Sequence, residues 1–322
     1  MIVVKGLHSY FKTEDGLVKA VDDITFELRP NEVLALVGES GCGKSVTALT
    51  VMGLLNRKKT VLKGEILFRE KRLLELSPEA YRQIRGDKIG MIFQEPMSAF
   101  DPLYTIGYQM QEVLKAHTNL SVEDQKQRAV HWLKNIGIPE AEKRFGQYPH
   151  EMSGGMLQRV MIAMALMLQP EVLIADEPTT ALDVTIQAQV LGLIRNLQKN
   201  EGTSVLFITH DLGVVAEIAD RVHVMYAGKI VEKGTVTRLF HRPLHPYTIG
   251  LLTSRVVKGK KGKELPFIPG YVPRAFELPE GCRFHPRCAQ KLPRCERESP
   301  PEFLIDHENR VACWLFERGE SA

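Results

Sequence analysis

GESGCGKS, at Gly38–Ser45, matches the phosphate-loop pattern G-x-x-x-x-G-K-[ST] at every fixed position. The apolar run VLALV (Val33–Val37) before it suits a buried strand, and SVTALTVMGLL (Ser45–Leu55) after it has helix-like spacing. In a strand–loop–helix unit, the N–H groups of the loop and the positive end of the helix converge on one anion. A chance match by a glycine-rich turn is the alternative, and these flanking elements disfavour it.

The loop residues are therefore candidate ligands of a nucleotide. We expect Lys44 to reach the β- and γ-phosphates and the Ser45 hydroxyl to hold Mg²⁺. The predicted nucleotide-contacting residues are Gly38, Glu39, Ser40, Gly41, Cys42, Gly43, Lys44 and Ser45.

Polar residues follow two further apolar runs. VLIADE (Val172–Glu177) predicts a central strand that ends in two carboxylates, with Asp176 holding Mg²⁺ and Glu177 orienting or deprotonating the attacking water. The alternative, a solvated loop start, is disfavoured beside a phosphate loop. SVLFIT (Ser204–Thr209) ends in His210, which at the same sheet edge can sense a γ-phosphate, although a lone histidine is more often structural.

Composition and charge exclude several classes of protein. The 322 residues carry a net charge of +3, from 42 basic and 39 acidic residues, which is too small to argue for nucleic acid or a membrane surface. The longest apolar run, Val160–Leu168, is far short of the ~20 residues that span a bilayer. The N-terminus lacks the pattern of a signal peptide, so a cytosolic location is expected.

Two weaker signals concern the regions around the loop. Residues 97–168 have a helical pattern, and within them Ser153–Gly155 precede an apolar helix, which is a second candidate anion site. Tyr10 and Phe11 form an aromatic pair, and either ring could stack on a nucleotide base. Composition alone favours ordinary core or edge aromatics for both.

The C-terminal part differs in composition, because prolines recur from about residue 243. A basic stretch at 256–264 is typical of a linker or loop. Four of the five cysteines fall here, and in a reducing compartment such clustering favours metal over disulfides. Their spacing lacks the short pairs of structural zinc and suits a 4Fe-4S cluster, with zinc and no metal as alternatives. These cysteines are Cys282, Cys288, Cys295 and Cys313.

Six motifs in this order resemble those of ABC transporter ATPases over about residues 1–240. They are the Walker A loop Gly38–Ser45, the Q-loop Gln94, the signature Ser153–Gly155, the Walker B strand Val172–Glu177, the D-loop Asp183 and the switch His210. The signature reads MSGGM where the family has LSGGQ, so a polar contact from Met156 is in doubt. RPLHPYTIGLL (Arg242–Leu252) and GCRFHPRC (Gly281–Cys288) resemble the C-terminal extension of the dipeptide/oligopeptide importer branch.

The resemblance implies an α/β fold: a RecA-like P-loop ATPase core with an antiparallel β-subdomain and a helical subdomain, plus a small cysteine-rich extension. The implied domains are a nucleotide-binding domain at 1–243, with the helical subdomain at about 97–168, and the extension at 244–322. ATP, Mg²⁺ and a 4Fe-4S cluster are the implied cofactors. Glu177, His210 and Gln94 become catalytic candidates, with Gln94 also a Mg²⁺ ligand. Phe11 becomes the base-stacking ring, and Ser153, Gly154, Gly155 and Asp183 become nucleotide-contacting residues.

The implied function is ATP hydrolysis that powers import of di- or oligopeptides. The implied partners are two transmembrane permeases, a homologous second ATPase subunit and an extracytoplasmic binding protein, with no nucleic acid, at the cytoplasmic face of the cell membrane. Related importers of nickel or glutathione are alternatives. A soluble ABC ATPase acting on ribosomes or DNA is a more distant alternative, and the intact Glu177 and His210 argue against a non-hydrolysing regulator.

Overall fold

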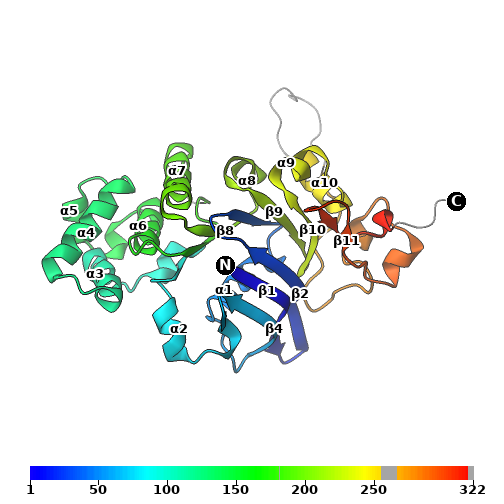
Figure 1. The fold of residues 1–322 in the computed structure, drawn as a ribbon, viewed down its shortest axis with the longest axis horizontal. Coiled ribbons are helices and arrows are strands. Elements are labelled where there is room, and N and C mark those ends of the chain that lie inside the picture. Colours follow the sequence, from blue (N-terminus) through cyan, green and yellow to red (C-terminus); the bar gives the residue numbers. More distant parts are fainter. Residues whose placement is uncertain (181, 255–266, 318–322) are drawn as a thin grey trace. The chain divides into compact units, whose positions relative to one another are not determined.

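The computed structural model describes residues 1–180, 182–254 and 267–317 (Figure 1). The predicted linker at 256–264 lies outside these residues. The chain divides into two compact units, which are described separately. Unit 1 comprises Met1, Leu28–Val33 and Glu75–Ile208, and unit 2 comprises the described residues of Ile2–Glu27, Leu34–Leu74 and Thr209–Ala322.

Unit 1 contains three parallel strands. β7 (Val172–Asp176) pairs with β6 (Ile89–Ile92) on one side and with β8 (Ser204–Thr209) on the other. Every residue of these strands is buried, as expected for uninterrupted apolar runs in a parallel sheet with both faces covered. Of the two carboxylates predicted for the end of the Val172–Glu177 run, Asp176 is therefore the last residue of a fully buried strand and Glu177 follows it.

Helices fill the connection between β6 and β7. After α2 (Pro78–Ile84), which precedes β6, the chain forms four helices in the segment predicted to be helical. Three of them begin where the sequence supplies a cap, because the side chains of Thr105, Ser121 and Ser153 each accept a hydrogen bond from the N–H three residues on. The four helices are α3 (Ile106–His117), α4 (Val122–Asn135), α5 (Ala141–Phe145) and α6 (Gly154–Leu166). α7 (Val184–Glu201) then connects β7 to β8.

Unit 2 contains an antiparallel sheet in the order β2-β1-β4-β5 (Figure 1). Side chains of β1 alternate between its two faces, so Ser9 and Phe11 share one face and Tyr10 lies on the other. The Ser9 hydroxyl is 2.9 Å from the hydroxyl of Thr50 in the helix after the phosphate loop. The strands are β1 (Ile2–Thr13), β2 (Gly16–Leu28), β4 (Thr60–Phe68) and β5 (Lys71–Arg72), and that helix is α1 (Lys44–Val51).

A second set of strands in unit 2 includes the C-terminal residues. β3 (Val33–Val37) runs parallel to β9 (Arg221–Tyr226), which pairs with β10 (Lys229–Thr235). β10 pairs in turn with β12 (Arg310–Val311), and β12 with β11 (Phe303–Leu304). Three helices cover this part: α8 (Leu212–Ile218), α9 (Val236–His241) and α10 (Pro246–Thr253).

One apolar cluster joins the phosphate-loop strand to residues beyond 243. Val37 of β3, Val224 of β9, Tyr247 of α10 and Phe284 are buried in it, and Cys282 packs against it. The segment with the four cysteines therefore shares its core with the strand that precedes the phosphate loop. The predicted boundary at residues 243/244 stays a prediction.

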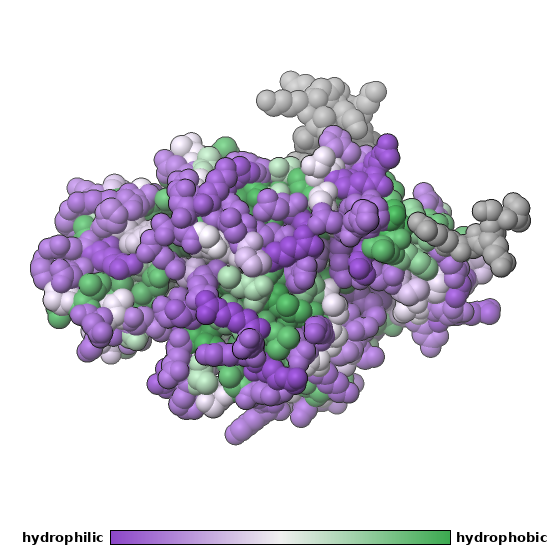
Figure 2. Space-filling model, in the orientation of Figure 1, coloured by the Kyte–Doolittle hydropathy of each residue, from purple (hydrophilic) through white to green (hydrophobic). Residues whose placement is uncertain are grey.

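One face of the molecule is largely polar. On the face shown in Figure 2, hydrophilic side chains cover most of the molecule, and hydrophobic ones form separate patches. Among the described residues, no helix combines the length and apolar character needed to cross a membrane.

Candidate functional site

The phosphate loop has a shape that only glycine permits at two positions. Gly43 is the N-cap of α1 and has φ +107°, in the left-handed region. A Cβ there would collide with the carbonyl oxygen of Ala20, and a Cβ on Gly38 would collide with that of Met225. The glycines of the motif therefore let the loop pass closely against its neighbours.

Lys44 lies over this loop. Its side chain is buried, and Nζ donates to the carbonyl oxygens of Gly38, at 2.8 Å, and Glu39, at 3.2 Å. Ser45 follows in the first turn of α1 and is half-buried. Cys42 is fully buried, and burial raises the pKa of its thiol, so this cysteine fills space in the loop as a neutral group.

Two residues that the sequence analysis missed contact the loop at Glu39. Arg287 forms an ion pair with its carboxylate, and the hydroxyl of Tyr247 accepts a hydrogen bond from its backbone N–H. Both lie more than 200 positions away in the sequence. They lie in the stretches Arg242–Leu252 and Gly281–Cys288, which resemble the C-terminal extension. Neither stretch carries a sequence signal for a contact with the loop.

In unit 1, the two acids at the end of β7 are almost completely buried. Asp176 is 3% exposed and Glu177 is 9% exposed. The Glu177 backbone has φ +48°, and its N–H donates to the Ile208 carbonyl at 2.9 Å. Thr180 donates its hydroxyl to Glu177 Oε2 at 3.0 Å, a contact that the sequence pattern did not reveal. Backbone and side chain of Glu177 are thus both fixed by neighbours.

The signature residues begin a helix that reaches toward these acids. Ser153 caps α6, whose first residues are Gly154 and Gly155. Further along α6, the Gln158 side chain donates to the Pro178 carbonyl at 3.1 Å, directly after the two acids. In unit 1, α6 therefore connects the signature residues at its start with the backbone that directly follows the two acids.

Asp183 has a defined structural role in unit 1. It is the N-cap of α7, and its carboxylate accepts hydrogen bonds from the backbone N–H groups of Thr185 and Ile186, both at 3.0 Å. The guanidinium of Arg159 in α6 interacts electrostatically with the Asp183 carboxylate. Burial lowers the pKa of Arg159, and the Asp183 carboxylate opposes that shift.

Gln94 and His210 are both exposed residues that follow buried strands. Gln94 comes two residues after β6, and His210 comes directly after β8. Asp211, beside His210, caps α8 by accepting hydrogen bonds from the N–H groups of Gly213 and Val214. Of the predicted site residues, unit 1 holds Gln94, Ser153, Gly154, Gly155, Asp176, Glu177 and Asp183, and unit 2 holds Phe11, Gly38–Ser45, His210 and the four cysteines.

The aromatic pair on β1 has two different environments. Tyr10 is engaged, because its hydroxyl donates to Asp22, which also contacts His8 Nδ1 at 3.0 Å. Burial and this hydrogen bond raise the pKa of Tyr10. Phe11 lies on the opposite face of the strand, the face from which Ser9 contacts α1.

The four C-terminal cysteines are free thiols gathered in one part of unit 2. Burial, reinforced by the charges of the other cysteines, raises the pKa of the Cys282 and Cys313 thiols to about 11. Among the described residues, no group of three or more histidine, cysteine and acidic side chains is arranged to hold a metal ion. Among the four sulfurs, Cys295 Sγ accepts the backbone N–H of Leu292 at 3.4 Å.

Comparisons with known proteins place these features in a family. A family model described as "ABC transporter" matches residues 21–180, and one described as "Oligopeptide/dipeptide transporter, C-terminal region" matches residues 231–295. The dipeptide transport ATP-binding protein DppD of Bacillus subtilis is 48% identical over 316 residues, covering 98% of this chain and 94% of DppD. The oligopeptide transport ATP-binding protein OppD of the same organism is 50% identical over 317 residues, covering 98% and 88%.

A solved structure agrees with the fold. The ATP-binding cassette MJ0796, in a dimeric post-hydrolysis state bound to ADP and Pi, has a TM-score of 0.68 and 27% identity, covering 73% of this chain and 99% of that one. The predicted α/β cassette fold and the family resemblance are confirmed. This chain belongs to the ABC transporter family, among the ATP-binding subunits of dipeptide and oligopeptide transporters.

Proposed function

We propose that this chain binds and hydrolyses ATP with Mg²⁺ to power the import of dipeptides or oligopeptides through membrane permeases. The observation that carries the proposal is a glycine-shaped phosphate loop at the start of α1, in a chain 48% identical to DppD over nearly its full length. The match of residues 231–295 to the C-terminal region of oligopeptide/dipeptide transporters supports the peptide branch.

In this proposal the loop holds the phosphates. Its backbone N–H groups and the N-terminal end of α1 supply positive electrostatic potential. Lys44, which bonds to the loop carbonyls of Gly38 and Glu39, carries the full charge that pairs with the β- and γ-phosphates. The Ser45 hydroxyl would be a ligand of Mg²⁺. Gly41, Ser40 and Cys42 contribute backbone rather than side-chain contacts.

The acids at the end of β7 supply the chemistry. Asp176 would hold Mg²⁺, and Glu177 would orient and deprotonate the attacking water. The hydrogen bonds from Thr180 and to the Ile208 carbonyl support this role, because a general base must be held in a fixed orientation. We assign His210 and Gln94 to the γ-phosphate, with Gln94 also completing the Mg²⁺ coordination.

The signature residues act toward the nucleotide of a second, homologous subunit. Ser153, Gly154 and Gly155 stand at the start of the 13-residue helix α6, whose N-terminal end favours an anion. The dimeric structure of MJ0796 bound to ADP and Pi supports a two-chain arrangement. Asp183, as the cap of α7, would present that helix to the partner subunit.

Phe11 is our choice for the ring that stacks on adenine. Tyr10 is committed to Asp22 through its hydroxyl, whereas Phe11 lies on the face of β1 from which Ser9 contacts α1. A base stacks on the face of a ring, and Lys19 Nζ already lies 5.9 Å from the centroid of the Tyr10 ring, which supports Phe11.

Permease contact is assigned to exposed apolar residues shortly after Gln94. Leu103 is 78% exposed, and Met97 and Tyr104 are also exposed, with the Tyr104 ring stacked on that of Tyr108 at 4.6 Å. Such a patch suits a protein partner. Two permeases would place the chain at the cytoplasmic face of the cell membrane, and an extracytoplasmic binding protein would deliver the peptide.

We further propose a 4Fe-4S cluster on Cys282, Cys288, Cys295 and Cys313. The gathering of four free cysteines in one part of unit 2 supports it, because such a cluster is held by four cysteine ligands. The thiolates of such a cluster bind separate irons, so they need not surround one ion as zinc ligands do. The cluster would stabilise a proline-rich segment that has few strands of its own.

The transport assignment can be tested by reconstituting the chain with its permeases and second ATPase subunit in proteoliposomes. We expect ATP-dependent uptake of dipeptides or short oligopeptides, and no uptake when Glu177→Gln replaces the wild-type chain. Uptake of nickel or glutathione without peptide uptake would overturn the peptide assignment while leaving the ATPase assignment intact.

The cluster can be tested separately by anaerobic purification. The chain should be brown and contain about four irons. Cys288→Ser should lose the iron, whereas Cys42→Ser, which alters the one cysteine outside the segment, should retain it. A colourless anaerobic protein, with one zinc or with no metal, would contradict the cluster.

A further inference from the structure

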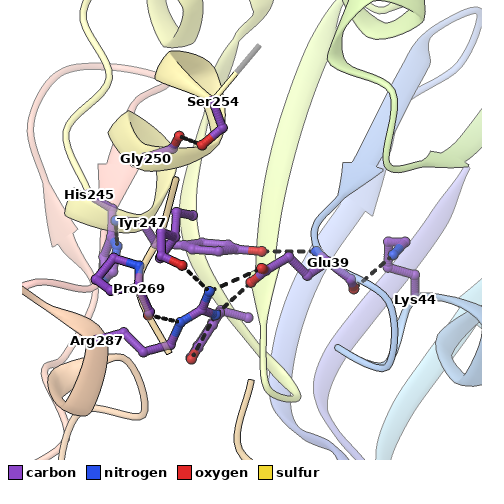
Figure 3. Close-up of polar contacts among 10 residues, drawn as sticks. Glu39, Lys44, His245, Tyr247, Gly250, Ser254, Pro269 and Arg287 are labelled. Carbon is purple, nitrogen blue, oxygen red and sulfur yellow. Dashed lines mark hydrogen bonds and ion pairs between the residues drawn. The ribbon is translucent and has the colours of Figure 1, made fainter. Parts of the chain in front are cut away.

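Glu39, the second residue of the phosphate loop, is held by three groups at once (Figure 3). Arg287 donates to both of its carboxylate oxygens, from Nη1 at 2.7 Å and from Nη2 at 3.1 Å. Its backbone N–H donates to the Tyr247 hydroxyl at 2.9 Å, and its carbonyl accepts from Lys44 Nζ at 3.2 Å. Side chain, N–H and carbonyl of this one residue are therefore all engaged.

Arg287 is itself locked in place. Its Nε donates to the Pro269 carbonyl at 2.9 Å and Nη2 to that of Ile268 at 3.3 Å, and its side chain is only 5% exposed in the pair with Glu39. A bidentate pair whose guanidinium is also bonded to backbone carbonyls tolerates little movement of its acceptor. The guanidinium thus transmits the position of the C-terminal segment to Glu39.

Tyr247 is anchored as firmly from another direction. Its ring is fully buried and lies edge-on to Tyr226 at 4.6 Å between centroids, and 5.4 Å from Phe284. His245 caps α10 beneath it by accepting the Tyr247 N–H at 3.0 Å. The hydroxyl that accepts from Glu39 is therefore attached to a rigid apolar core rather than to a free side chain.

We propose that Arg287 and Tyr247 are positioning residues of the nucleotide site, which set the shape of the phosphate loop by holding Glu39. The segment that carries the cysteines thereby helps to fix the shape of the phosphate site. The Lys44 ammonium bonds to the same peptide that Arg287 and Tyr247 fix, so a shift of Glu39 moves the group that meets the phosphates. This inference deepens the proposed function and rests on nucleotide binding by the loop.

The structure supplies a matched control. Arg283 lies four residues before Arg287, is equally buried at 9% against 8% exposed, and forms an ion pair with Asp22 of β2. It also donates to the Ala227 carbonyl. In the part of the chain that the structure describes, Arg283 forms no hydrogen bond or ion pair with Glu39. Loss of Arg283 therefore loosens the same segment without releasing the loop residue.

The test is a titration of the 322-residue chain with a fluorescent ATP analogue and Mg²⁺, alongside a thermal melt. Arg287→Gln should weaken binding by roughly fivefold or more, the range of typical site coupling. Arg283→Gln should lower the melting temperature comparably but leave affinity within about twofold of wild type. Arg287→Lys should not restore affinity, because an ammonium cannot make the bidentate contact.

A reciprocal readout separates positioning from mere stability. Nucleotide should slow amide hydrogen exchange in the segment around Arg287 of the wild-type chain, and the protection should disappear in Arg287→Gln. Tyr247→Phe, which keeps the ring and removes only the acceptor hydroxyl, provides a milder variant if Arg287→Gln does not fold. It should weaken binding by roughly two- to fivefold.

Two outcomes would overturn the inference. One is equal affinity loss in Arg287→Gln and Arg283→Gln. The other is unchanged affinity and unchanged exchange protection in both Arg287→Gln and Tyr247→Phe. Failure of the wild-type chain to bind nucleotide would instead refute the proposed function, so the two failures are distinguishable.

Discussion

The phosphate loop follows one buried five-residue strand, VLALV, and the two acids lie at the end of another, VLIAD. In our proposal, backbone N–H groups of the loop bind the phosphates, and glycines such as Gly43 make the shape possible. At the end of β7, two side chains carry the proposed chemistry, and Thr180 fixes one of them, Glu177. Substitutions should therefore separate binding from chemistry according to the region they alter.

The largest effect should come from the acidic end of β7. Glu177→Gln keeps the size of the side chain and removes the base, so hydrolysis should fall by about 10²–10⁴-fold. Nucleotide affinity should stay near wild type, because the loop is unchanged. Single-turnover hydrolysis and equilibrium binding in the assembled transporter measure the two effects. Normal turnover of the variant would remove Glu177 from its assigned role.

The loop should give the opposite pattern. Lys44→Ala removes a buried ammonium that is already positioned over the loop carbonyls. Hydrogen bonds to charged groups are worth ~1.5–3 kcal/mol each, so we expect roughly 10²-fold weaker ATP binding. Isothermal titration with ATP and Mg²⁺ measures this loss. Unchanged affinity together with reduced turnover would erase the distinction between the two regions.

A smaller effect should come from the base contact. Phe11→Ala should cost ~1–3 kcal/mol of ATP affinity through lost stacking. Tyr10→Phe is the matched control, because it removes the hydroxyl bonded to Asp22 and keeps a ring at the neighbouring position. Comparing the affinity for ATP with the affinity for inorganic triphosphate isolates the contribution of the base. If the Tyr10 variant loses base-dependent affinity and the Phe11 variant does not, the ring is misassigned.

The smallest change in a binding or folding free energy should come from the cap of the signature helix. Ser153→Ala removes the acceptor for the Met156 N–H, which is 3.3 Å away, and should lower the free energy of unfolding by about 1 kcal/mol. Ser153→Gly should cost only a few tenths as much stability. Both variants should lose partner-dependent hydrolysis if Ser153 contacts the nucleotide of the second subunit. Full hydrolysis in both would leave Ser153 with its capping role alone.

Local patterns carried much of this fold. The apolar runs of β3, β7 and β8 were visible in the sequence, because the burial pattern of a strand depends on residues close in the chain. The rotation of Glu177 into the left-handed region was not visible. No local residue preference marks it, since a glutamate adopts that conformation only when its surroundings impose it.

The sequence by itself determined the phosphate loop, the acids at Asp176 and Glu177 and the family, because glycine geometry and strand periodicity are local properties. Only the tertiary structure decided that Arg287 holds Glu39, 248 positions earlier, and that Tyr10 is committed to Asp22 while Phe11 faces the other way. The physical reason is that a bidentate ion pair exists only when packing fixes both partners. Here the packing comes from an apolar core shared by β3, β9, Tyr247 and Phe284.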